Sequence, residues 1–132
     1  MIQSGIFNEI KNNEYFSTLL ANDDGTLRIY PHRVPAGMLN TNDEFITYSM
    51  ISAPKDRQIG YTKATFQINC ISKSYDKVNE MANNLEALFG FYQGNLGGKF
   101  KVDRVRQLNK YDMFDNETGL YMMPVEVKFI YR

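Results

Sequence analysis

The residue types that most often catalyse reactions are sparse in this sequence. His32 is the only histidine and Cys70 is the only cysteine, so a nucleophile activated by an imidazole would have to use His32. Cys70 lies in the middle of an alternating apolar segment, which indicates a buried and inert thiol. We therefore expect no Cys–His catalytic pair, and a single cysteine allows no intrachain disulfide.

Two short segments could be mistaken for binding loops. "NDDG" at residues 22–25 has too few oxygen ligands at the spacing of a calcium loop, and there is no Cys/His cluster for zinc. "GNLGG" at residues 94–98 follows an expected helix and precedes an expected strand, whereas a phosphate-binding loop opens a helix. We expect no catalytic, cofactor-binding or metal-binding residues, and no enzyme activity.

One segment is strongly basic. Five cations fall within twelve residues, with Asp103 the only acid among them: Lys99, Lys101, Arg104, Arg106 and Lys110. Arg104 and Arg106 are two residues apart, so they would share one face of a strand. We interpret this segment as a solvated or inter-subunit face, with contact to DNA or to an acidic partner as the alternative.

The overall composition is that of an ordinary globular protein. A chain of 132 residues indicates a single domain over residues 1–132 that can bury a core without a metal or disulfide. Its 15 basic and 15 acidic residues balance, which argues against a dedicated nucleic-acid binder and against strong electrostatic membrane binding. We recognise no signal peptide and no apolar run long enough to span a membrane, and the single cysteine fits a reducing cytosol.

Alternating apolar and polar residues predict five strands, because a period of two places every second side chain on one face of a sheet. The strands cover residues 26–31, 44–52, 61–72, 99–108 and 120–131. In the third strand the apolar face comprises Ala64, Phe66, Ile68 and Cys70. In the last strand it comprises Val125, Val127, Phe129 and Tyr131.

Two helical regions accompany these strands. Residues 75–92 carry the clearest apolar stripe, with Ser74 as N-cap and Gly94 as the residue that ends the helix. Residues 4–20 carry a weaker stripe with Ser4 as N-cap, and their polar "KNNE" could divide them into two short helices. The element order predicts an α+β fold: an antiparallel sheet of four to five strands with an N-terminal helix and one long helix packed on one face.

The last strand has two unusual features. Pro124 lacks a backbone N–H, which favours an edge position or a bulge. Met122 and Met123 precede it, and we expect one of them in the core. The other could be an adaptable contact residue, and Met122 is our candidate.

The connection "APKDRQIG" at residues 53–60 is longer than a hairpin needs. Lys55, Asp56 and Arg57 make its middle polar, and Ile59 offers one apolar anchor. Because long polar loops on a rigid sheet often carry docking surfaces, we predict an arm that contacts a partner. An ordinary solvent loop is the alternative. The candidate interface residues are thus Lys55, Asp56, Arg57, Ile59, Lys99, Lys101, Arg104, Arg106 and Met122.

Several segments, taken in order, resemble one known family. They are "LRIYPHRVPAG", "EFITYSMIS", "FQINCISKSYDKVNEMANNLEALF" and "YDMFDNETGLYMMPVEVKFIYR", and they span residues 27–132. Their order, their spacing and the ending "ETGLY…YR" resemble the tail-completion, or tail-terminator, proteins of long-tailed bacteriophages. The stretch "YMMPVEV" departs from many relatives, which are more apolar or contain arginine there.

The resemblance implies a virion structural protein without catalytic residues or cofactors. It would form a ring, typically a hexamer, at the head-proximal end of the tail tube, end tube polymerisation and join tail to head. Its partners would be further copies of itself, the tail tube protein, the head-completion or connector protein and the tape-measure protein. Genomic DNA would only pass through the lumen, and no membrane would be involved.

This family also implies a location. The ring would be assembled in the cytoplasm of a bacterial host and would lie at the head–tail junction of the virion tail. A head-completion stopper or a tail-tube subunit of the same machine is the first alternative. A small α+β enzyme and a nucleic-acid-binding module are further alternatives.

Overall fold

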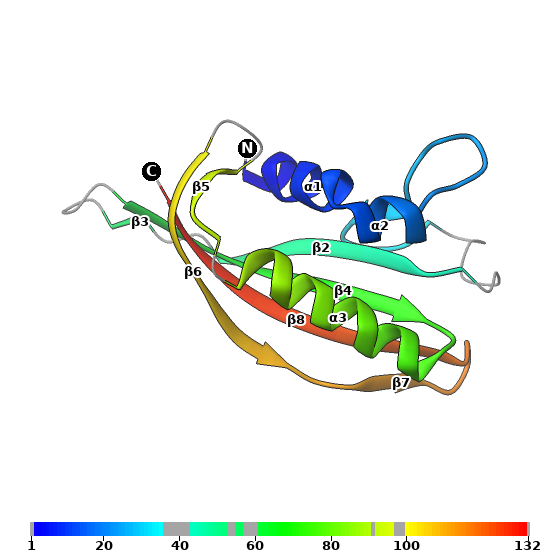
Figure 1. The fold of residues 1–132 in the computed structure, drawn as a ribbon. Coiled ribbons are helices and arrows are strands. Elements are labelled where there is room, and N and C mark those ends of the chain that lie inside the picture. The colour runs from blue at the N-terminus through cyan, green and yellow to red at the C-terminus, as the bar shows by residue number, and fades with distance from the viewer. Residues whose placement is uncertain are drawn as a thin grey trace.

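Apolar stripes on three helices pack against one face of a curled sheet (Figure 1). The computed structural model describes residues 2–35, 43–52, 55–56, 61–90, 92–96 and 100–131. The helices are α1 (Ile2–Asn12), α2 (Glu14–Leu19) and α3 (Tyr75–Phe89). The strands are β1 (Ile29–Pro31), β2 (Phe45–Ser52), β3 (Lys55–Asp56), β4 (Tyr61–Ser72), β5 (Gly94–Leu96), β6 (Phe100–Lys110), β7 (Met113–Asp115) and β8 (Leu120–Tyr131).

The sheet is mixed and has more strands than expected. Its order is β1-β2-β4-β8-β6-β5, with β3 paired to β4 and β7 paired to β8. The prediction of a purely antiparallel sheet is wrong, because β1 runs parallel to β2. The described residues form eight strands rather than four to five. The extra strands have two or three residues each, too few for an alternating pattern to reveal them.

The long helix covers the sheet as its apolar stripe predicts. Its buried residues are Val78, Met81, Ala82, Leu85 and Phe89. The predicted N-cap is confirmed, since Ser74 Oγ accepts a hydrogen bond from the backbone N–H of Lys77 at 3.3 Å. The predicted C-terminus is wrong, because the helix ends at Phe89 with Gly90 as its C-cap.

The segment "GNLGG" is therefore not simply a turn that ends the helix. Its first three residues form β5, which begins at Gly94 with a φ of +126°. Leu96 is completely buried in the main core. A Cβ added to Gly5 of α1 would lie 3.1 Å from Leu96 Cγ, so the glycine lets α1 approach β5 closely. Burial of Leu96 explains why residues 94–96 are extended despite their glycine and asparagine.

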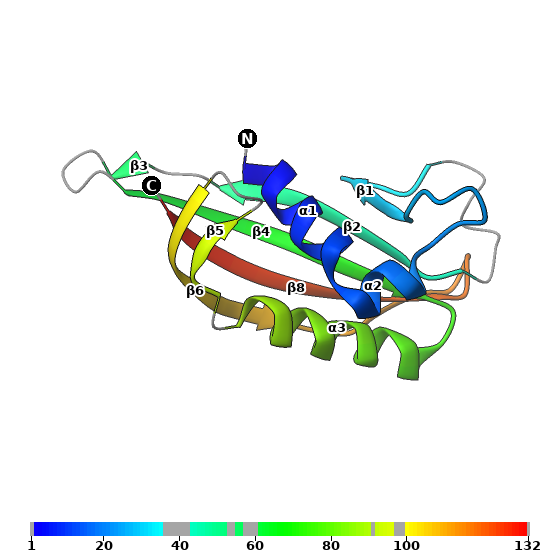
Figure 2. The ribbon, with the colours of Figure 1, turned by 45° about the horizontal axis from the view of Figure 1, so that its top comes forward.

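The N-terminal region forms two helices that divide at "KNNE", one of the two alternatives. Asn13 caps α2, and its side chain accepts a hydrogen bond from the N–H of Phe16 at 3.3 Å. The proposed N-cap Ser4 is wrong, because α1 begins at Ile2 and Ser4 lies inside it. The two helices lie beside α3 over the same face of the sheet (Figure 2). Tyr15 of α2 donates a hydrogen bond to the carboxylate of Glu80 in α3 at 2.7 Å.

Arg28 ties the helical layer to the sheet. Its side chain is buried and donates to the backbone oxygens of Leu19, Ala21 and Glu44 at 2.8–3.0 Å. It also donates to Asn22 Oδ1 at 3.1 Å. The guanidinium thereby satisfies carbonyls that the end of α2 and the following turn leave unpaired.

Strand β8 lies at the centre of the sheet, between β4 and β6. Of the two alternatives for Pro124, the edge position is thus wrong, and an irregularity in the neighbouring strand takes the place of the bulge. Its carbonyl accepts from the N–H of Tyr111, at the interruption between the end of β6 at Lys110 and the start of β7 at Met113. Because the N and O of one residue in an antiparallel strand face the same neighbour, the missing N–H of Pro124 faces this interruption. That placement removes little hydrogen bonding.

A smaller apolar cluster lies on the face of the sheet opposite the helices. It contains Val34, Phe45, Ile71 and Leu120, with Tyr30 and Met122 packed against it. Met123, by contrast, is buried in the main core, which settles which of the two methionines is the core residue. Beside this cluster a buried polar chain runs from Gln67 to Asn69 and on to Thr47, with both hydrogen bonds at 2.9 Å. No helix of the described residues is long and apolar enough to cross a membrane.

Candidate interaction surfaces

The residues best suited to catalysis do not form a site. Cys70 is completely buried in the main core, and burial raises the pKa of its thiol, as expected for an inert cysteine. His32 is exposed at the end of β1, in a left-handed backbone conformation with a φ of +67°. Within the part of the chain that the structure describes, no three His, Cys, Asp or Glu side chains come close enough to hold a metal ion.

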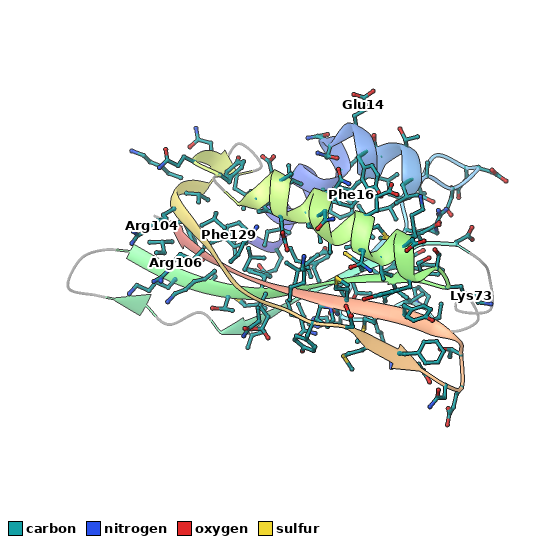
Figure 3. The ribbon with its side chains drawn as sticks, turned by 60° about the horizontal axis from the view of Figure 1, so that its bottom comes forward. Glu14, Phe16, Lys73, Arg104, Arg106 and Phe129 are labelled. Atoms are coloured by element: carbon teal, nitrogen blue, oxygen red, sulfur yellow. The ribbon has the colours of Figure 1, made fainter. Side chains whose placement is uncertain are left out.

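The basic segment lies mainly along β6. Arg104 and Arg106 pair with Ile130 and Lys128 of β8, whereas Val105 between them pairs with the buried Phe129. The two arginines therefore share one face of the strand, as predicted, and the structure shows that this face points away from the helices. Figure 3 shows both of them close to one end of the sheet.

Two lysines from other strands join these arginines. Lys63 of β4 pairs with Ile130, and Lys128 of β8 pairs with Arg106. Both lie on the same face as the arginines. Lys101 of β6 also lies on this face, because it directly precedes Val102, which is buried in the main core. We call Lys63, Lys101, Arg104, Arg106 and Lys128 the cationic face. None of the five forms an ion pair with another described residue.

Two members of the basic segment do not belong to the cationic face as described. Lys110 turns toward α3, where its Nζ lies 2.8 Å from the carboxylate of Glu86. Lys99 lies outside the described residues. The sequence could not have supplied Lys63 and Lys128, since only the strand register brings them beside β6.

A second surface lies at the other end of the sheet. We call residues 111–122 together with Tyr75 the hairpin end. It gathers most of the large apolar side chains that are exposed among the described residues: Tyr75, Tyr111, Met113 and Phe114. Phe114 is 50 % exposed and Met113 is 45 % exposed. Such a concentration is typical of a contact surface.

The aromatic rings of the hairpin end are held in place by one another. Tyr121 stacks on Tyr75 with ring centroids 5.4 Å apart, and it meets Phe114 at 4.7 Å. The hydroxyl of Tyr75 donates to the carboxylate of Asp112 at 2.7 Å. These contacts fix exposed rings on a rigid base, which lowers the entropy cost of a contact made through them.

A hollow of about 640 Å³ opens beside these rings. Its apolar wall consists of Ile71, Met113, Phe114, Leu120 and Met122, and the turn 115–118 forms its polar wall. Met122, the candidate contact residue, is half-buried there. Sequence reasoning missed β7 and Phe114, although "YDMFD" places large apolar residues among acids directly before a polar turn.

The predicted docking arm is partly a strand. Lys55 and Asp56 form β3 and pair with Thr62 and Tyr61 of β4. The segment is therefore not the single eight-residue loop that was expected. Arg57 and Ile59 lie outside the described residues. A docking role for this segment remains a prediction.

Comparisons with known proteins show which solved structures share this fold. No protein-family model matches this chain, and no curated protein matches it in sequence. It aligns with a chain in the virion of a native gene transfer agent particle at a TM-score of 0.68 and 12 % identity, covering 98 % of this chain and 92 % of that one. A second solved protein, whose description gives no function, aligns at a TM-score of 0.55 and 15 % identity, covering 98 % and 95 %. At these identities the likeness establishes a shared fold.

Proposed function

We propose that this chain is a structural protein of a phage-like virion. The observation that carries the proposal is the likeness in fold, over nearly the whole of both chains, to a chain in a gene transfer agent virion. The resemblance of residues 27–132 to tail-terminator proteins points the same way, since it rests on the order and spacing of sequence segments. The first line of support is a likeness in three-dimensional fold, and the second is a likeness in sequence pattern.

Within that class, we propose the role of tail terminator. Copies of the chain form a closed ring at the head-proximal end of the tail tube, stop its growth and provide the surface for the head. The cationic face and the hairpin end support an assembly role, because both present exposed side chains and both are anchored to the long strand β8. Rigid strands hold such surfaces in fixed relative positions, as a repeating ring contact requires.

Association in free solution should be weaker than in the particle. The exposed apolar side chains of the described residues are few, and they do not form the long continuous surface of an obligate interface. Binding to the tube end would then stabilise the ring by mass action. We expect rings to dissociate on dilution of the free protein.

Electron microscopy of the purified protein, alone and with tail tubes, tests this role. The terminator should form closed rings, and added protein should stop tube growth. Long open stacks of the protein alone would instead indicate a tail-tube subunit. Rings that bind heads without stopping tube growth would indicate a head-completion stopper.

A further inference from the structure

The two exposed surfaces lie at opposite ends of the long central strands. Lys63 pairs with Ile130 near one end of the β4–β8 ladder, and Ile71 pairs with Met122 near the other. Eight residues along β4 separate these two pairs, which corresponds to about 26 Å of strand. In Figure 3, Arg104 and Arg106 lie toward one end, and β7 lies toward the other. One copy therefore cannot bring its two surfaces together.

The two surfaces have opposite charge although the whole chain is neutral. The cationic face contributes five basic side chains; the strand register places Glu126 beside them, and Asp103 lies between Lys101 and Arg104 in sequence. The hairpin end contributes the exposed carboxylates of Asp112, Asp115 and Glu117. A chain with no net charge thus carries two separated patches of opposite sign.

The side-chain types of the two surfaces are also complementary. An arginine guanidinium can bind a carboxylate through two parallel hydrogen bonds and can stack on an aromatic ring. The hairpin end offers carboxylates and exposed rings together, with Phe114 and Tyr111 close in sequence to Asp112 and Asp115. Arg104 and Arg106 have no described ion-pair partner of their own.

We infer that the cationic face of one copy binds the hairpin end of a second copy. This inference deepens the proposed ring, on which it rests, by naming the two surfaces that meet. Because the surfaces differ and lie at opposite ends, the contact is head-to-tail. A head-to-tail contact closes into a ring when its rotation allows. DNA is the other polyanion that could bind the cationic face, and the test separates the two.

Charge reversal on each surface tests the contact. One variant carries Arg104→Glu and Arg106→Glu. The other carries Asp115→Asn, Asn116→Lys and Glu117→Lys, where the asparagine keeps the acceptor that Asp115 offers to the N–H of Glu117. Each variant alone should associate at least about tenfold more weakly than the unaltered protein, since like charges would face each other. Native mass spectrometry across protein concentrations measures this.

Mixing the two variants provides the decisive comparison. In a one-to-one mixture the reversed face of one variant can bind the reversed hairpin end of the other. The unaltered face of the second variant can likewise bind the unaltered hairpin end of the first. Association should therefore return in the mixture and in a single chain that carries both sets of changes. The matched control carries Lys11→Glu and Arg33→Glu, at exposed sites outside both surfaces. It changes the net charge by the same amount as the face variant, and it should associate normally.

Disulfide trapping tests the same contact without requiring closed rings. Arg106→Cys and Glu117→Cys proteins, mixed under oxidising conditions, should give mixed dimers, whereas Lys11→Cys with Glu117→Cys should not. Cys70 is buried and should stay unreactive. Equal trapping of both pairs, or none at high concentration, would overturn the contact.

The outcomes separate this inference from the proposed function. If rings form equally well in every charge variant, the contact is wrong while the ring remains. If the face variant loses only salt-sensitive binding to DNA and associates normally, the cationic face serves nucleic acid and the contact is again wrong. If mixed dimers form but no protein caps tail tubes, the contact stands and the terminator role fails.

Discussion

Among single residues, Arg28 is the one whose side-chain hydrogen bonds hold the helical layer and the sheet together. Its buried guanidinium serves three backbone carbonyls and Asn22, and no carboxylate is among these partners. We predict that Arg28→Ala lowers the free energy of unfolding by about 2–4 kcal/mol, because buried carbonyls lose their donors. Chemical denaturation measures the loss.

Arg33 provides the control for this prediction, because it is exposed and only five residues away. Arg33→Ala should change the free energy of unfolding by no more than about 0.5 kcal/mol. Equal effects of the two substitutions would mean that the hydrogen bonds of Arg28 contribute little.

Tyr92 gives a prediction about alkaline pH. Burial and a 2.9 Å hydrogen bond to the carboxylate of Glu9 raise its pKa from 10.0 to about 12. A raised pKa means that the folded state favours the neutral phenol. Its contribution to stability is complete below pH 10 and is lost as the pH rises toward 12. Tyr92→Phe should flatten this part of the stability profile, and an unchanged profile would contradict the assignment.

At the scale of elements, α3 carries the clearest test. Leu85 is buried in the middle of its apolar stripe, so Leu85→Ala should cost about 2–5 kcal/mol. Glu86 faces Lys110 in a partly exposed ion pair, so Glu86→Ala should cost at most about 1 kcal/mol. Denaturation midpoints compare the two, and similar losses would mean that the helix face is wrongly assigned.

The long elements could be predicted from the sequence because their patterns repeat. β4 covers residues 61–72, the range that alternation predicts, and α3 begins where its N-cap predicts. β5 and β7 have three residues each, so pairing with neighbours creates them rather than any local pattern. The first strand was predicted over residues 26–31, but β1 covers only Ile29–Pro31. The central place of β8 could not be predicted, because Pro124 fitted an edge position as well as a bulge, and the interruption beside it depends on tertiary pairing.

The segment after β2 yields a prediction about its role. Replacing residues 54–59 with Asn-Gly removes β3 but leaves the pairing of β2, β4 and β8 intact. The melting temperature should therefore change little, because closure entropy varies slowly with loop length. If this segment is a docking arm, the variant should fail to cap tails in an assembly assay. Normal capping would contradict the docking role and mean that residues 53–60 are an ordinary solvent-exposed connection.

At the scale of the whole molecule, the candidate surfaces depend on tertiary structure. Arg104 and Arg106 could be paired from sequence, because both belong to one strand. Lys63 and Lys128 join them through register, and Tyr75 joins Phe114 through the packing of α3 on the sheet. Such long-range neighbours leave no trace in one sequence. The opposite charges at the two ends were therefore invisible until the fold placed them.

The terminator role predicts what a particle would lack without this chain. Electron microscopy of particles assembled in its absence should show filled heads separate from tails, and the tails should vary in length. Adding the purified protein should restore joined particles, whereas adding the Arg104→Glu/Arg106→Glu variant should not. Joined particles with tails of normal length, formed without this chain, would contradict the proposed function.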